Sequence, residues 1–125
     1  MERVLIVDDE ENTRIGLSKL LSQNGYQTQA AADGLEALEC LGQENIDLVI
    51  TDISMPGMNG LDFLYELRKL YPEVKVVMMT AYGGVDSYLN SMNLGAFDYL
   101  NKPVKLRDLK VILERIFTSE DTVTQ

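Results

Sequence analysis

Residues 4–9, Val-Leu-Ile-Val-Asp-Asp, form a short apolar run that ends at two carboxylates. The run Leu-Val-Ile-Thr at residues 48–51 leads in the same way into Asp52, and Val-Val-Met-Met at 76–79 leads into Thr80. A weaker segment, Asp-Tyr-Leu at 98–100, precedes Lys102. Short β-branched runs separated by helical patterns are typical of buried parallel strands.

Helical patterns fill the gaps between these runs, and Gly or Pro follows most of them. We expect a further strand at about 27–31 and helices at about 12–23, 34–42, 61–71, 84–94 and 106–117. Asp33 is the expected N-cap of the second of these helices, and Gly83-Gly84 is expected to open the fourth. The inward faces of the first and last helices are expected to carry Ile15, Leu17, Leu20 and Leu21, and Leu106, Leu109, Leu113 and Ile116. Strands that alternate with helices predict an α/β domain with one parallel sheet covered on both faces.

The composition narrows the function. A net charge of −9 argues against direct binding of nucleic acid, which needs a basic patch. The absence of histidine excludes Ser-His-Asp catalysis and places any phosphohistidine on another protein. Cys40 is the single cysteine and cannot form an internal disulfide, which favours a reducing cytoplasm. We expect no membrane partner, because no apolar run reaches spanning length and the N-terminus does not resemble a signal peptide.

Chemistry-bearing residues follow the strands at one edge of the expected sheet. The carboxyl ends of parallel strands share an edge, so Asp8, Asp9, Asp52, Thr80 and Lys102 should converge there. Each of these residues, taken alone, is most simply interpreted as a turn or surface residue. Only their common placement at one edge of the sheet indicates a functional site. Oxygen ligands without His or Cys favour Mg²⁺ or Mn²⁺. The predicted pocket therefore suits a divalent cation and a phosphoryl group.

Four segments in order carry a resemblance to a known family. They are Asp8-Asp9, Asp-Ile-Ser-Met-Pro-Gly-Met-Asn-Gly at 52–60, Thr80-Ala81, and Gly-Ala-Phe-Asp-Tyr-Leu-Asn-Lys-Pro at 95–103. From about residue 3 to 117 the chain resembles the receiver domain of bacterial response regulators, the CheY-like family. The resemblance implies a doubly wound five-stranded sheet of order 2-1-3-4-5 with five helices. It also implies a receiver domain at 1–118, followed by a polar tail or the start of a linker at 119–125.

The resemblance also implies a role for each matched residue. Asp52 would be the phosphoacceptor. Mg²⁺ or Mn²⁺ would be bound by Asp8, Asp9, Asp52 and the backbone carbonyl of Ser54. Thr80, Ala81 and Lys102 would contact the phosphoryl group, Thr80 and Tyr99 would form the conformational switch, and the Lys102–Pro103 peptide bond would be cis.

The function implied is signal transduction in a cytoplasmic two-component phosphorelay. The chain would take a phosphoryl group from a histidine kinase or phosphotransfer protein, and would be no enzyme beyond its own phosphorylation and dephosphorylation. An output domain or a second copy would meet the face formed by the helix at 84–94, the strand at 98–100 and the helix at 106–117.

Two other interpretations stay open. A small phosphatase of the haloacid dehalogenase type also uses a strand-end aspartate, but that family requires a second aspartate at the position that Ser54 occupies in this chain. A binding module, either a degenerate receiver or a flavodoxin-like domain, is opposed by the intact set of site residues and by the acidic run at 8–11, which would repel an FMN phosphate.

Overall fold

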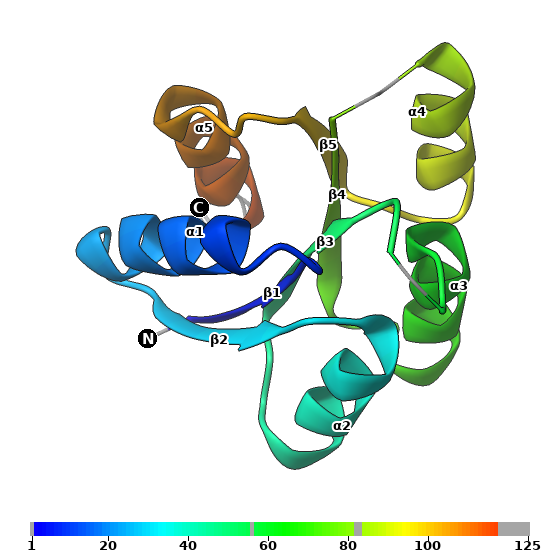
Figure 1. The fold of residues 1–125 in the computed structure, drawn as a ribbon, viewed down its shortest axis with the longest axis horizontal. Helices are drawn as coiled ribbons and strands as arrows, with labels where there is room; N and C mark the ends of the chain where they lie inside the picture. The colour runs from blue at the N-terminus through cyan, green and yellow to red at the C-terminus, as the bar shows by residue number, and fades with distance from the viewer. Residues whose placement is uncertain (1, 56, 82–83, 118–125) are drawn as a thin grey trace, which may run out of the picture.

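The computed structural model describes residues 2–55, 57–81 and 84–117. Five strands alternate with five helices (Figure 1): β1 (Arg3–Val7), α1 (Glu11–Gln23), β2 (Gln27–Ala31), α2 (Gly34–Gln43), β3 (Leu48–Asp52), α3 (Gly60–Leu70), β4 (Lys75–Thr80), α4 (Val85–Asn93), β5 (Asp98–Asn101) and α5 (Leu106–Phe117). The strands form one parallel sheet of order β2-β1-β3-β4-β5, so the predicted architecture is confirmed. Gly83, expected to open the fourth helix, and the tail at 119–125 lie outside the described residues.

The sheet lies between two helical layers, with α1 and α5 on one face and α2, α3 and α4 on the other (Figure 1). Side chains along β1 alternate between these layers, as the two-residue period of a strand requires. Val4 and Ile6 pack with residues of α1 and α5, whereas Leu5 and Val7 pack with residues of α2 and α3. Since β1, β3 and β4 are covered on both sides, their carboxyl ends are held in fixed positions relative to one another.

Two residues expected on inward helix faces point outward instead. Ile15 is 56% exposed, because α1 packs through Leu17 and Leu21, and a residue two positions before Leu17 lies on the opposite side of a helix. Leu106 is 37% exposed, since it is the first residue of α5. The expectation also omitted Ile112, which is buried in the α5 face.

The helix starts use different stabilising contacts. Asp33 caps α2 as predicted, because its side chain accepts a hydrogen bond from the Glu36 amide at 2.8 Å. Asn59 caps α3 in the same way through the Asp62 amide, at 2.9 Å. The N-cap residue of α1, Glu10, makes no side-chain capping bond, so the start of α1 is held by other contacts. Each helix that the structure describes falls short of the length and apolar character needed to span a bilayer.

Candidate functional site

The site is built on the turn that joins β1 to α1. Asp8 follows β1 directly and is fully buried, and its amide donates to the Ala31 carbonyl at 3.1 Å. Its Oδ1 accepts from the Glu10 amide at 2.9 Å, which folds the chain back toward α1. Asp9 is exposed. Even so, oxygens from Asp8, Asp9 and Asp52 all lie within 4.8 Å of one another, as predicted from the shared sheet edge.

Asp52 ends β3 and is 6% exposed. Its Oδ1 lies 3.3 Å from the Ser54 amide, which donates to it. The loop that follows returns to β3 through Gly60, whose amide donates to the Ile53 carbonyl at 2.6 Å. This return packs α3 against the backbone that carries Asp52.

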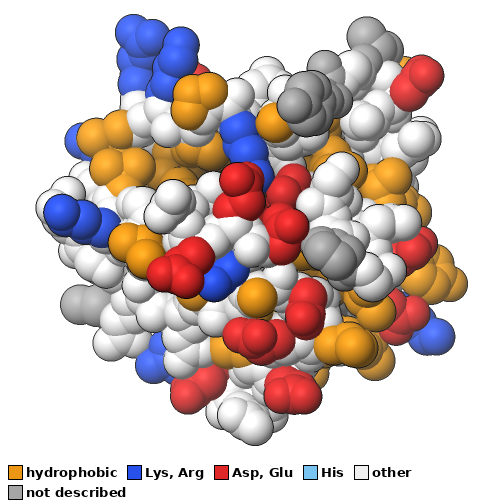
Figure 2. Space-filling model, viewed as in Figure 1, with side chains coloured by type: hydrophobic (Ala, Val, Ile, Leu, Met, Phe, Trp, Pro, Cys, Tyr) orange, Lys and Arg blue, Asp and Glu red, His pale blue; other side chains and the backbone are white. Residues whose placement is uncertain are grey.

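Lys102, which directly follows β5, brings a positive charge into the acidic cluster. Its Nζ lies 2.6 Å from Asp8 Oδ2, 3.0 Å from Asp52 Oδ2 and 3.6 Å from a Glu10 oxygen. Its amide donates to the Thr80 carbonyl at 2.8 Å, and the Lys102–Pro103 peptide bond is cis, the geometry that the resemblance implies. Figure 2 shows the result as acidic side chains gathered at the centre of this face beside a basic one.

The charges of Asp52 and Lys102 favour the binding of a further cation beside Asp52. Burial raises the pKa of the Asp52 carboxyl, with Lys102 opposing the rise and Asp8 adding to it. Burial alone would lower the pKa of Lys102, but its hydrogen bonds and charge interactions with Asp8 and Asp52 outweigh burial and raise it. Lys102 therefore stays protonated, while the buried Asp52 carboxylate is only partly compensated.

The donor set fits a hard divalent cation. Asp8, Asp9 and Asp52 supply oxygen only, and Lys102, which also pairs with Glu10, offsets only part of their negative charge. A divalent ion would balance the remaining charge, and Mg²⁺ prefers one or two carboxylates together with water and phosphate. These three residues could therefore hold Mg²⁺ at the sheet edge.

Thr80 and Tyr99 lie on β4 and β5, the strands beyond Asp52 in the sheet, and Ala81 follows Thr80. Thr80 ends β4 and is 6% exposed, whereas Ala81 is exposed beyond it. Burial raises the pKa of the Tyr99 phenol, while the neighbouring hydroxyls of Ser87 and Thr80 lower it in part. The Tyr99 ring also meets Tyr88 of α4 edge to face, with 5.7 Å between centroids. Tyr99 is thus turned inward and links β4, β5 and α4.

The α4 helix is weakly anchored. Among the α4 side chains that the structure describes, only Ser91 is buried, and its hydroxyl has no hydrogen-bond partner there. In contrast, α5 buries Leu109, Ile112, Leu113 and Ile116. A helix with few buried apolar contacts is held by a smaller free energy than its neighbours.

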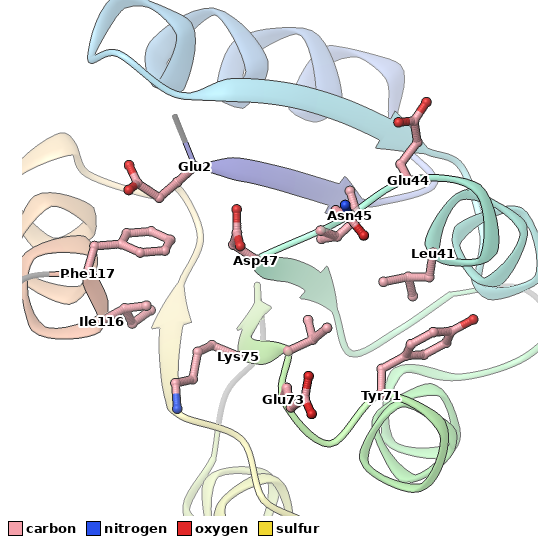
Figure 3. Close-up of a pocket in the computed structure, with 12 residues that line it drawn as sticks. Glu2, Leu41, Glu44, Asn45, Asp47, Tyr71, Glu73, Lys75, Ile116 and Phe117 are labelled. Atoms are coloured by element: carbon pink, nitrogen blue, oxygen red, sulfur yellow. The ribbon is translucent and has the colours of Figure 1, made fainter. Parts of the chain in front are cut away.

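A cavity of about 650 Å³ lies at the opposite edge of the sheet. Ile116 and Phe117 of α5 line one side, and Leu41 and Tyr71 line the other (Figure 3). Two of its acidic groups are already engaged by Arg3: Asp47 accepts from the Arg3 amide at 2.8 Å, and Glu44 pairs with the guanidinium at 2.9 Å. Since its charged groups do not converge on one point as the aspartates do, the candidate site is the carboxyl edge.

Comparison with known proteins gives one consistent result. The sequence model of the response regulator receiver domain matches residues 4–114. Sporulation initiation phosphotransferase F of Bacillus subtilis is 38% identical over 109 residues, which cover 87% of this chain and 88% of that protein. The regulatory protein AtoC of Escherichia coli is 39% identical over 115 residues, or 92% of this chain but only 25% of that protein.

Solved structures agree with the sequence relatives. A response regulator receiver domain protein from Clostridium thermocellum superposes with a TM-score of 0.90 at 31% identity, covering 98% of this chain and 99% of that one. The response regulator TrrA from Thermotoga maritima, solved in complex with Mg²⁺-BeF, superposes with a TM-score of 0.85 at 38% identity, covering 94% and 100%. The chain belongs to the family of receiver domains of two-component response regulators.

Three features of the site were not predicted from the sequence. They are the Glu10–Lys102 ion pair, the contact of Tyr88 with Tyr99, and a hydrogen bond from Arg14 to the Asp8 carbonyl. The helical spacing of Arg14, one turn after the acidic residues, is the only signal in the sequence that points to its contact. The other two features depend on packing between segments far apart in the chain.

Proposed function

We propose that Asp52 is the phosphoacceptor of this receiver domain. The observation that carries the proposal is the convergence of Asp8, Asp9 and Asp52 within 4.8 Å, with Lys102 Nζ 3.0 Å from Asp52. A carboxylate at this position is anionic and fixed in direction, and a cation lies beside it. These are the requirements for a nucleophile that attacks a phosphoryl group.

We propose Mg²⁺ as the resident cation, held by Asp8, Asp9, Asp52 and the backbone carbonyl of Ser54. When bound, Mg²⁺ offsets the repulsion between the acceptor carboxylate and the incoming phosphoryl oxygens. Mn²⁺ shares this preference for oxygen ligands and should substitute for it. Lys102 adds its own charge on the opposite side of Asp52.

The reaction is a phosphoryl transfer in which one bond to phosphorus forms as another breaks. A carboxylate oxygen of Asp52 attacks phosphorus, the P–N bond of a donor phosphohistidine breaks, and the imidazole leaves with the electron pair. Thr80, Ala81 and Lys102 contact the transferred group through a hydroxyl, an amide and an ammonium. Water later attacks the same phosphorus, which restores the carboxylate and releases inorganic phosphate.

The output is a change in the face formed by α4, β5 and α5. A phosphoryl group on Asp52 would draw in the Thr80 hydroxyl, and Tyr99 shares its environment with both Thr80 and α4. Because α4 buries so little, a small change in these contacts would shift its position. That face is then the proposed contact for an output domain or a second copy.

The proposed partners follow from the chemistry and from the relatives. The donor is a histidine kinase or phosphotransfer protein, since this chain has no histidine. Residues 1–118 form the receiver, and 119–125 are a tail or the start of a linker. The chain spans most of the first relative, at 88%, but only about a quarter of AtoC. We place it in the cytoplasm and propose that it acts on no substrate other than its own acceptor.

Acetyl phosphate provides the test. Incubation with Mg²⁺ should add the mass of one phosphoryl group, and Asp52→Asn should abolish the addition. Asp47→Asn is a matched control, because Asp47 precedes the same strand but lies at the opposite edge of the sheet. Equal labelling of Asp52→Asn and the unaltered chain would refute the assignment. Steady turnover of an added phosphomonoester would favour the phosphatase alternative instead.

A further inference from the structure

The peptide that joins the two predicted metal ligands of the β1–α1 turn is held from one turn into the helix. Arg14 Nη1 donates to the Asp8 carbonyl oxygen at 2.8 Å, in a partly buried contact. This oxygen belongs to the planar unit between Asp8 and Asp9, so fixing it fixes how the chain leaves Asp8 and enters Asp9. We infer that Arg14 is a positioning residue that sets the direction of the Asp9 carboxylate for cation binding.

The other polar groups of Asp8 hold different parts of the turn. Its amide bonds to Ala31, its Oδ1 accepts from Glu10, and its Oδ2 pairs with Lys102. The Oδ1 bond to the Glu10 amide closes a turn around Asp9, but none of these contacts touches the Asp8 carbonyl oxygen, which Arg14 holds directly. The carbonyl is the group whose orientation decides where the next side chain points.

The structure at the start of α1 explains why Arg14 holds the turn. Glu10, the N-cap residue, makes no side-chain capping bond, so the turn is not locked in the usual way. Arg14 is nevertheless tied to the turn at both ends, because its own amide donates to the Glu10 carbonyl at 3.1 Å. Its side chain then reaches back over the first helical turn to Asp8. The contact therefore couples the rigid helix to the exposed Asp9.

The direction of the change in Mg²⁺ affinity when Arg14 is replaced distinguishes a positioning role from a purely electrostatic one. Arg14 is a cation near an acidic cluster, so the loss of its charge alone would tighten binding of another cation. The loss of positioning would weaken binding, and groups that orient metal ligands from behind are commonly worth about tenfold in affinity or more. The inference rests on the proposed Mg²⁺ site, and it predicts the weaker binding.

The test is a calorimetric titration of the whole 125-residue chain with Mg²⁺. Arg14→Met should weaken binding about tenfold, and Arg14→Lys, which keeps a donor and the charge, should recover most of it. Lys19→Met removes the same charge from an exposed position on α1 and should leave binding unchanged or slightly tighter. In the metal-free protein, the Asp9 amide signal should broaden in Arg14→Met and not in Lys19→Met.

Unchanged or tighter binding by Arg14→Met would overturn the inference. If that variant fails to fold by circular dichroism, Arg14→Gln, which is neutral and shorter, gives the same reading. Failure of the unaltered chain to bind Mg²⁺ would instead refute the proposed function on which the inference rests.

Discussion

Replacing Gly60 with alanine is expected to lower the melting temperature, because there is no room for a side chain where α3 meets the acceptor strand. An added Cβ would lie 2.5 Å from Ile53 Cα and 2.8 Å from the Ile53 carbonyl oxygen, and closer still to the Asp52 carbonyl oxygen. Ordinary contacts begin near 3.4 Å, so one backbone segment would have to move by about 1 Å. These are backbone atoms, which cannot rotate aside as a flexible side chain can.

Overpacking of this kind costs about 1–3 kcal/mol. For a domain of this length, 1 kcal/mol corresponds to about 3–5 °C, so Tm should fall by about 3–15 °C. Phosphorylation by acetyl phosphate should also slow, because the displaced backbone carries Asp52.

Gly16→Ala is the matched control. No atom lies within 4 Å of a Cβ built at Gly16, which is inside α1. Alanine there should stabilise the helix by about 1 kcal/mol and raise Tm by a few degrees. Scanning calorimetry of both variants gives the comparison. A Tm for Gly60→Ala within about 1 °C of the unaltered chain would refute the steric argument.

Three further outcomes are expected. Asp52→Asn should raise the free energy of unfolding of the metal-free protein at pH 7. Because the pKa of Asp52 is raised in the folded state, its titration stabilises the fold below about pH 4, and this contribution is lost as the pH rises through the folded pKa. The gain in stability from the substitution should therefore vanish in acid. Denaturant unfolding across pH checks this, and a gain that persists at low pH would contradict it. Lys102→Ala should leave Mg²⁺ affinity unchanged or higher while slowing phosphorylation, and a titration showing weaker binding would oppose the division of roles. Beryllofluoride should shift amide signals at 84–93 and 98–101, whereas shifts confined to the loops after β1 and β3 would mean that α4 does not respond.

The sequence was sufficient for the fold because its signals were local and repeated. Runs of β-branched residues ended at polar groups, and the parallel sheet forced those ends together, so the cluster of Asp8, Asp9 and Asp52 followed from topology alone. Asp33 could be assigned as a cap because its partner amide lies only three residues away.

Errors arose where the outcome depended on which neighbour a helix meets. Ile15 is apolar and lies within a helical pattern, yet the sheet contacts the opposite face of α1. Leu106 has the right spacing for the α5 face but stands at the helix end. The contacts of Arg14 and Tyr88 were also missed, because a long side chain and an aromatic pair take their partners from the packed fold.

Trapping the acyl phosphate identifies the phosphorylated residue itself. After incubation with acetyl phosphate and Mg²⁺, borohydride reduction converts a phosphorylated aspartate to homoserine, and peptide mass spectrometry then identifies the modified residue. We predict homoserine at residue 52 alone, and none when Mg²⁺ is removed with a chelator. Homoserine at Asp8 or Asp9, or labelling at residue 52 that does not depend on Mg²⁺, would contradict it.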